Sequence, residues 1–260
     1  MTQNIYDDPG FFEAYGRLPR SRQGLEGAPE WPALQRLLPP IDAREVLDLG
    51  CGLGWFSRWA AESGARSVLG VDLSERMLAD ARARTRSGKV RFERHDLESL
   101  ILPAHSRDLI YSSLVLHYVE RLPALLATLF AALRPDGRLV FSVEHPLFTT
   151  PSNAVWETLA SGAVVWPLDQ YLLEGPRITN WLAPGVIKQH RTVAGYITLL
   201  LAAGFVLQEI EEWGPSSEQI ADHPEWACER HRPPFLLVSA KRPSGRRGST
   251  PIPRARKRES

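Results

Sequence analysis

The stretch Val46-Leu47-Asp48-Leu49-Gly50-Cys51-Gly52-Leu53-Gly54-Trp55 decides the fold that we expect for this chain. Residues 45–49 predict a short buried strand, and residues 55–62 can form a helix directly after the turn. The turn has a glycine at every second position, which allows positive φ angles and lets a ligand approach the main chain closely. A strand, a glycine-rich turn and a helix in this order fit a nucleotide-binding α/β protein.

Two carboxylates narrow the choice of ligand. A dinucleotide site has the glycine spacing G-x-G-x-x-G, whereas the spacing here is G-x-G-x-G. Asp48 lies two residues before the first glycine, where a carboxylate repels a phosphate and attracts an ammonium group. Asp72 follows the next predicted strand, residues 67–71, and is placed to accept hydrogen bonds from ribose hydroxyls. The ligand implied has a ribose and an amine and lacks a pyrophosphate.

These features resemble the class I S-adenosylmethionine-dependent methyltransferases, whose first motif is similar to residues 46–54 and whose second motif is similar to residues 71–78. The resemblance extends to about Ala240. It is closest to bacterial small-molecule members that begin with Phe-Phe-x-x-Tyr, here residues 11–15, and carry Glu-His-Pro, here residues 144–146, after the fifth strand. It implies an α/β fold with a doubly wound, seven-stranded Rossmann-like sheet in the order 3-2-1-4-5-7-6, strand 7 antiparallel. It also implies an enzyme with S-adenosylmethionine as its cofactor.

The same resemblance implies which residues bind the cofactor. In the family an acid after the third strand binds the adenine amino group and the next backbone N–H meets a ring nitrogen; Asp96 and Leu97 match, although capping of a turn is the alternative for Asp96. Related enzymes cover the cofactor with their N-terminal segment, which would bring Tyr15 to the ligand and Arg20 near the methionine carboxylate. The other expected residues belong to the two motifs and the fourth strand: Asp48, Gly50, Cys51, Gly52, Gly54, Asp72, Leu73, Met77 and Ser112.

The remaining elements follow from hydrophobic periodicity and from turn residues. Further strands are predicted at residues 90–94, 108–114, 138–144, 205–212 and 234–241, and further helices at residues 31–38, 75–85, 123–133 and 193–203. Residues 1–40 form either a lid or an aromatic segment that packs on the sheet. The pattern breaks between residues 147 and 190, which we interpret as a substrate cap inserted after the fifth strand. A single methyltransferase domain therefore covers residues 1–242.

The formal net charge of +1 hides an asymmetry along the chain. Residues 241–260 carry eight basic residues and one acidic residue, a net charge of +7, so the remainder of the chain has a charge of about −6. An acidic body argues against a broad nucleic-acid surface. Residues 243–260 are polar and contain no aromatic residue, which predicts a disordered and dispensable basic tail. Binding of RNA or another polyanion by this tail is the alternative.

The N-terminus and the cysteine content bear on location. Residues 1–8 have neither a basic region nor an apolar core, so they do not predict a signal peptide. No apolar run approaches the roughly 18 residues that a membrane helix needs. The 2 cysteines give no disulfide framework. We therefore expect a soluble, cytoplasmic protein with no membrane partner, and the sequence leaves its oligomeric state open.

Methyl transfer to oxygen or nitrogen is an in-line displacement in which alignment supplies most of the rate. A base is needed only where the acceptor must lose a proton, and a histidine suits that role at neutral pH. Three histidines follow predicted strand ends or precede the last helix and are candidate catalytic residues, with a structural or substrate-positioning role as the alternative: His117, His145 and His190. No His, Cys, Asp or Glu cluster has the spacing of a metal site.

We expect the methyl acceptor to be a small, partly aromatic or planar molecule, because the insertion is rich in tryptophan. The alternative is that these tryptophans pack a small core of the insertion itself. Base methylation at amino groups is disfavoured, since the fourth strand ends in Tyr-Ser-Ser-Leu at residues 111–114 and not in a Pro-Pro-aromatic motif. Formation of 5-methylcytosine needs a nucleophilic cysteine. It is disfavoured because Cys228 lies beside Glu229, where a thiolate is poorly stabilised. The alternatives are a nucleic-acid methyltransferase that uses the basic tail, an NAD-dependent oxidoreductase and a non-catalytic module that binds S-adenosylmethionine.

Overall fold

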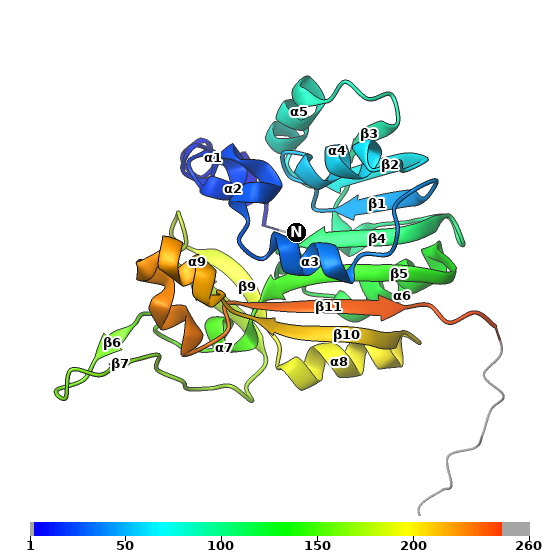
Figure 1. Cartoon of the computed structure of the whole chain (residues 1–260). Coiled ribbons are helices and arrows are strands. Elements are labelled where there is room, and N and C mark those ends of the chain that lie inside the picture. The colour runs from blue at the N-terminus through cyan, green and yellow to red at the C-terminus, as the bar shows by residue number, and fades with distance from the viewer. Residues whose placement is uncertain (1–2, 246–260) are drawn as a thin grey trace, which may run out of the picture.

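The computed structural model describes residues 3–245. Within that range seven strands form one central sheet in the order β10-β11-β5-β4-β1-β2-β3 (Figure 1). The strands are β1 Glu45–Leu49, β2 Ser67–Asp72, β3 Val90–Arg94, β4 Arg107–Ser113, β5 Leu133–Glu144, β10 Val206–Trp213 and β11 Phe235–Lys241. β11 pairs antiparallel with both β5 and β10, and the other pairs are parallel. The predicted doubly wound order 3-2-1-4-5-7-6 is confirmed, with strand 7 antiparallel.

Helices cover both faces of this sheet, because side chains alternate along each strand. The main helices are α3 Trp31–Leu37, α4 Trp55–Glu62, α5 Glu75–Arg84, α6 Leu122–Ala132 and α8 Val193–Ala202. On β1, Val46 packs in a core with residues of α3 and α4, whereas Leu47 and Leu49 pack in a second core with residues of α6 and α8. Asp48 therefore faces α4, and this orientation decides which groups it meets.

The fifth strand differs from its prediction. We expected this strand to begin at residue 138. Instead β5 already pairs at Leu133, opposite Arg107, and resumes at Arg138, opposite Leu109. The intervening residues form a bulge, in which Asp136 has a φ of 65°. Residues 134–137 therefore interrupt a strand that begins earlier than expected.

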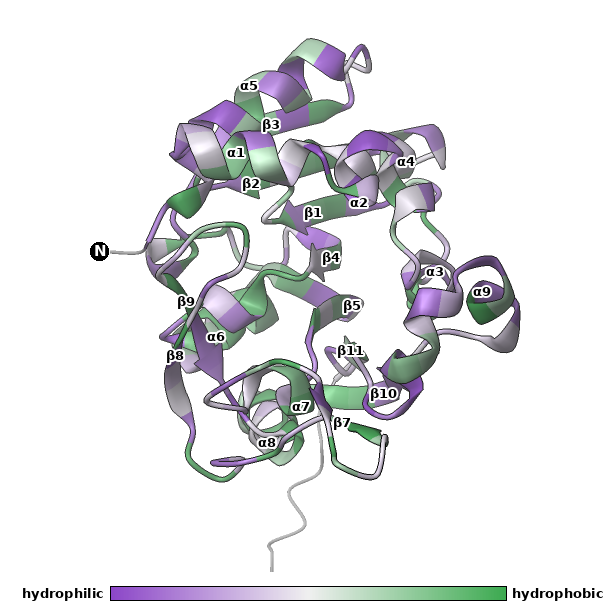
Figure 2. Cartoon of the chain, turned by 90° about the vertical axis from the view of Figure 1, so that its left-hand side faces the viewer, coloured by the Kyte–Doolittle hydropathy of each residue, from purple (hydrophilic) through white to green (hydrophobic). Residues whose placement is uncertain are grey.

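The carboxyl ends of the parallel strands meet at one edge of the sheet, and this edge faces the viewer in Figure 2. Around this edge lie the N-terminal elements and the insertion that follows β5. The N-terminal elements are η1 Ile5–Asp7, α1 Pro9–Gly16, α2 Pro19–Arg22 and η2 Gly24–Gly27. The insertion contains α7 Pro146–Thr149, β6 Glu157–Thr158, β7 Val164–Val165, β8 Gly175–Thr179 and β9 Val186–His190. Both segments are therefore close to the place where α/β proteins bind ligands.

A second insertion lies between β10 and β11, where the sequence predicted neither a helix nor a strand. It contains α9 Ser217–Asp222 and the 3-10 helix η5 Pro224–Arg230. Arg232, which follows η5, is buried, and its guanidinium carbon lies 4.0 Å from the ring centroid of Trp166 and 5.1 Å from that of Trp156. These tryptophans of the first insertion therefore pack around an arginine of the second.

The other short elements are the 3-10 helices η3 Leu97–Ser99 and η4 Leu116–Tyr118, which follow β3 and β4. Among the described residues no helix is long and apolar enough to cross a membrane. Of the predicted basic tail, residues 246–260 lie outside the described part of the chain.

Candidate functional site

A cavity of about 580 Å³ opens at the edge where the parallel strands end, and we call it the main cavity. This volume is within the range of small-molecule sites, roughly 300–1,000 Å³. Its walls come from the glycine turn, the ends of β2, β3 and β5, the loop after β4, the N-terminal segment and the first insertion. A smaller cavity of about 100 Å³ adjoins it and shares Tyr15, Arg20, Gly50, Gly52 and Ser113 with it.

The glycine turn brings backbone to the floor of the main cavity. Gly50 has a φ of 65°, and a Cβ atom there would collide with Val115. Gly52 has a φ of 51°, and the space where its Cβ would lie is open. The Gly52 N–H donates to Asp72 Oδ2 at 2.9 Å. The turn is therefore held in place by Val115 and Asp72. The space beside Gly52 is open, so a ligand can contact the main chain there.

Asp72 is held at the end of β2 by two backbone donors. Its carboxylate accepts from the N–H groups of Gly52 and Ser74, each at 2.9 Å. Burial raises the pKa of Asp72, although these hydrogen bonds act in the opposite direction. Leu73 and Met77, which follow it in the second motif, also line the main cavity. These three predicted residues are thus brought together beside the glycine turn, where a pair of hydroxyls can reach the carboxylate.

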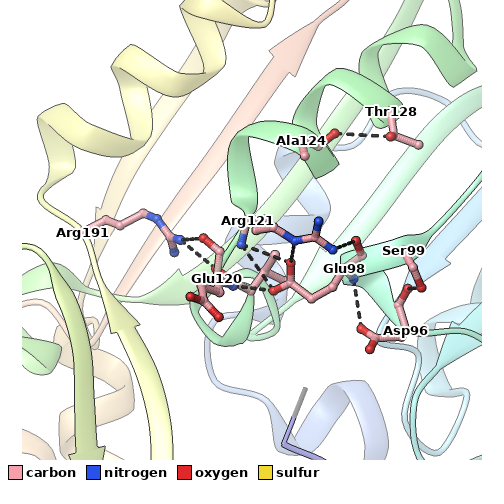
Figure 3. A network of polar contacts seen from close by, with 9 residues as sticks. Asp96, Glu98, Ser99, Glu120, Arg121, Ala124, Thr128 and Arg191 are labelled. Atoms are coloured by element: carbon pink, nitrogen blue, oxygen red, sulfur yellow. Dashed lines mark hydrogen bonds and ion pairs between the residues drawn. The ribbon is translucent and has the colours of Figure 1, made fainter. Parts of the chain in front are cut away.

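Asp96 and Leu97 lie together in the wall of the main cavity at the end of β3. The Asp96 side chain accepts from the Glu98 N–H at 3.0 Å and so caps η3. Glu98 in turn accepts from the backbone N–H groups of Glu120 and Arg121, and the Arg121 guanidinium donates back to the Glu98 carbonyl (Figure 3). These hydrogen bonds connect the loop after β3 to the loop after β4. They stabilise the part of the cavity wall around Asp96 and Leu97 that could hold a planar base.

Asp48 and Arg20 bring opposite charges to the small cavity. Asp48 is buried, and its carboxylate accepts from Ser57 Oγ on α4 at 2.6 Å. Burial raises the pKa of Asp48 to about 7. Arg20 pairs with the buried carboxylate of Glu30 at 3.1 Å and also lines the main cavity, as does Tyr15. A carboxylate and a guanidinium at one end of the site are the groups that could receive a zwitterionic amino-acid moiety.

Four predicted cofactor residues do not line the main cavity, and one of them, Asp48, lines only the small cavity. Ser112 is fully buried and donates to the Leu49 carbonyl at 3.1 Å, so it joins β4 to β1. Gly54 is the N-cap of α4, and its α-carbon faces Phe92. Cys51 lines only the small cavity, and burial raises the pKa of its thiol well above the usual value. For Ser112, Gly54 and Cys51 the structure favours roles in packing the turn, and contact with the cofactor stays a prediction for each of them.

His117 is the one candidate histidine that lines the main cavity within the described chain. It is 1% exposed, and its Nδ1 accepts from the Glu144 N–H at 3.3 Å. In a neutral ring the proton is then on Nε2, which makes that atom a donor. Burial lowers the pKa of His117 well below its usual value, and the charges of Lys188 and Arg191 act in the same direction. His117 is therefore suited to donate a hydrogen bond rather than to accept a proton.

The other two candidate histidines are buried outside the cavity walls that the structure describes. His145 lies 2.9 Å from Glu212 through Nε2 and accepts from the Leu147 N–H through Nδ1, which caps α7. His190 Nδ1 lies 2.9 Å from Thr149 Oγ1, and its Nε2 lies 2.9 Å from the Tyr171 carbonyl. Both nitrogens of each ring are already used, so the geometry favours the structural alternative for both.

Several cavity residues were missed from the sequence. Ser113 lines both cavities in place of Ser112, because neighbours on a strand point to opposite faces and the sequence does not fix which is which. Tyr6 and Tyr118 line the main cavity with their hydroxyls 3.4 Å apart, although 112 positions separate them. No local pattern signals such a contact.

The N-terminal segment and the first insertion meet over the cavity. Gln3 donates to the Gly185 carbonyl at 2.9 Å and accepts from the Ile187 N–H at 3.0 Å. Trp181 lines the main cavity, and its ring centroid lies 5.6 Å from that of Phe11 and 6.2 Å from that of Tyr15. The two segments therefore form a joint roof. No group of His, Cys, Asp or Glu suited to a metal ion occurs in the part of the chain that was described.

Comparison with known proteins gives the following matches. The model of the methyltransferase domain family matches residues 47–141. The crystal structure of an S-adenosylmethionine dependent methyltransferase from Mesorhizobium loti superposes with a TM-score of 0.82 at 52% identity, covering 84% of this chain and 100% of that one. An uncharacterized protein of Haemophilus influenzae is 36% identical over 251 residues, which cover 92% of this chain and 97% of the relative.

Curated relatives with a stated activity match over a shorter region. A malonyl-[acyl-carrier protein] O-methyltransferase of Pectobacterium atrosepticum is 34% identical over 48% of this chain and 49% of its own length. A trans-aconitate 2-methyltransferase of Deinococcus radiodurans is 38% identical over 46% of this chain and 48% of its own length. The chain thus spans just under half the length of each of these two relatives.

Proposed function

The chain belongs to the S-adenosylmethionine-dependent methyltransferases, and from that premise we propose that it transfers the methyl group of this cofactor to an oxygen or nitrogen atom of a small molecule. The observation that carries the proposal is the main cavity, which extends past the glycine turn and Asp72 to the end of β5. β4 separates β1 from β5 in the sheet, so the two ends of the site are about 10 Å apart at the usual strand spacing. This leaves room for a second, smaller molecule.

The residues present fit the cofactor. Asp72 suits the ribose hydroxyls, Asp96 and the Leu97 backbone suit the adenine, and Asp48 and Arg20 suit the ammonium and carboxylate of the methionine part. When bound, the cofactor supplies a methyl group that its sulfonium has already activated. The protein's own task is then to hold the acceptor in line and to exclude water.

The acceptor end of the cavity has aromatic walls. Tyr6, Tyr118 and Trp181 line it, and burial raises the pKa of both tyrosines, which keeps their hydroxyls protonated and neutral. Aromatic side chains bury apolar area with few rotatable bonds and position a ring or a short chain well. We propose the N-terminal segment as a lid and the first insertion as a substrate cap, which the contacts of Gln3 and Trp181 support. The curated relatives act on malonyl-[acyl-carrier protein] and on trans-aconitate, and the second of these supports a small-molecule acceptor.

Calorimetry and a labelling assay test the proposal. Titration with S-adenosylmethionine should release heat with a single site, whereas NAD should not bind. Incubation of the protein with a metabolite extract and methyl-labelled cofactor should place label on a small product that mass spectrometry identifies. Label found only on RNA or protein would reopen the acceptor class. Cofactor binding without any labelled product would instead favour a non-catalytic binding module.

A further inference from the structure

Glu144, the last residue of β5, has a carboxylate oxygen that accepts no hydrogen bond from the described protein. Its side chain lines the main cavity and is 12% exposed. Oε1 accepts from Lys188 Nζ at 2.6 Å, and Oε2 is buried without a partner among residues 3–245. A carboxylate offers about four lone-pair positions. The last torsion of a glutamate is broad and roughly two-fold, so either oxygen can turn to the cavity.

Lys188 holds this carboxylate in position. It belongs to β9 of the first insertion and is 2% exposed at its side chain. Its ammonium lies 5.0 Å from the ring centroid of Trp181 and 6.0 Å from that of Phe148, so aromatic faces surround it. Because Lys188 does not line the main cavity in the described structure, it compensates the charge of Glu144 from behind.

The other ionisable groups around this end of the cavity are already occupied or unsuited. His117 uses Nδ1 to accept from the Glu144 backbone, and its lowered pKa keeps it neutral. Glu98 is bound by Arg121, and Arg191 donates to the carbonyls of Val119 and Glu120 (Figure 3). The Glu120 residue is exposed at the rim. Glu144 is thus the enclosed anionic acceptor at the end of the cavity opposite Asp72.

We propose, building on the function above, that Glu144 binds the nucleophilic N–H or O–H of the acceptor and receives its proton, so that the enzyme methylates amines, alcohols or phenols and not carboxylates. The lone pair of the acceptor atom forms the bond to the methyl carbon while the carbon–sulfur bond breaks, and its electron pair stays on sulfur. The proton of the acceptor passes to Glu144 and then to solvent. A carboxylate acceptor, such as the trans-aconitate of one curated relative, would meet the like charge of Glu144. Lys188 and Arg121 are each paired with a carboxylate, and Arg191 donates to the carbonyls of Val119 and Glu120.

The first experiment identifies the bond that carries the label. Product from the metabolite extract and methyl-labelled S-adenosylmethionine is treated with mild alkali, which hydrolyses methyl esters to methanol and leaves methyl amines and ethers intact. We expect the label to survive, and mass spectrometry then separates amine from ether. Release of the label as methanol would overturn the inference while leaving the methyltransferase function in place. Absence of any label transfer would count against both, and cofactor binding would then stand alone.

The second experiment tests the residue itself. Glu144→Gln keeps the shape of the side chain and an oxygen for Lys188 but removes the base, so labelling should fall about 10²–10⁴-fold. Cofactor affinity should change less than twofold, and Glu144→Asp should recover part of the rate. Glu209→Gln, an exposed carboxylate on β10, is the matched control and should label at the wild-type rate. Wild-type labelling by Glu144→Gln, with the protein folded and binding cofactor, would refute the assignment.

Discussion

The two halves of the main cavity are built in different ways. The cofactor half, apart from Tyr15 and Arg20, comes from residues 48–97 and is fixed by bonds within that stretch, such as the one that the Gly52 N–H donates to Asp72. The acceptor half is assembled across the chain, through the contacts of Tyr6 with Tyr118 and of Lys188 with Glu144. A local motif can specify a shared cofactor, whereas the acceptor depends on long-range packing. The two halves should therefore respond independently to substitution.

The largest effect is expected from Lys188→Met. The substitution keeps most of the side-chain volume but leaves the enclosed Glu144 carboxylate without its counter-charge. Breaking a buried ion pair by removing one partner costs about 3–5 kcal/mol of unfolding free energy, and we expect a value near the lower limit because Glu144 keeps contact with the cavity. Urea denaturation of the purified variant measures the loss.

The matched control is Lys188→Met in a Glu144→Gln background, where no charge is stranded and the loss should be much smaller. Cofactor affinity of the Lys188→Met protein, measured while it is folded, should equal that of the wild type. A parallel loss of cofactor affinity would show that the two halves are coupled. It would contradict the expectation that they respond independently to substitution.

Asp72→Ala should act on the cofactor half alone. The lost hydrogen bonds to the ribose should weaken cofactor binding by about 1.5–3 kcal/mol, as measured by calorimetry. The melting temperature should also fall, because Gly52 and Ser74 lose the acceptor of their N–H groups. Asp222→Ala, an exposed acid on α9, serves as the control. Unchanged cofactor affinity in the Asp72 variant would refute the assignment of the ribose site.

The difference between the halves also explains what the sequence could predict. The strand at residues 45–49, the helix at residues 55–62 and the strand at residues 90–94 were predicted with the observed bounds, since hydrophobic periodicity and glycine punctuation are local signals. The helix α9 was missed although its capping box, Ser216 with Gln219, was readable. Glu144 was not among the predicted site residues, because nothing in the sequence reveals that Lys188 lies beside it.

Asp48 offers a sharper test through pH. Its pKa of about 7 in the free protein should fall when an ammonium group binds nearby, so binding below pH 7 releases a proton. Cofactor affinity should then rise up to tenfold per pH unit towards pH 7 and level off above it. Calorimetry at several pH values measures this slope. Asp48→Asn should abolish the slope, and a retained slope would place the titrating group elsewhere.

The same shift has the opposite sign for the stability of the free protein. The pKa of Asp48 is about 7 in the folded protein and about 4 in the unfolded chain. The contribution of Asp48 to the free energy of unfolding is therefore fully present below about pH 4 and is lost as the pH rises through 7. Asp48→Asn should therefore raise the melting temperature of the free protein above pH 7 while it weakens cofactor binding. The acid is retained for the ligand at a cost in stability, which fits its place in the cofactor half.

The smallest effect is expected at the C-terminus, where the position of the cut decides the outcome. Arg242 donates through Nη1 to the carbonyls of Phe130, Ala131 and Leu133, which end α6, and so belongs to the fold. A chain that ends at Gly245 keeps these bonds and should retain the melting temperature, cofactor affinity and labelling rate of the full chain. Arg242→Ala is the contrasting variant and should lose about 1 kcal/mol of unfolding free energy. If removal of residues 246–260 abolished labelling, or removed a salt-sensitive affinity for RNA, the basic tail would take part in acceptor binding, and the acceptor half would extend beyond the cavity.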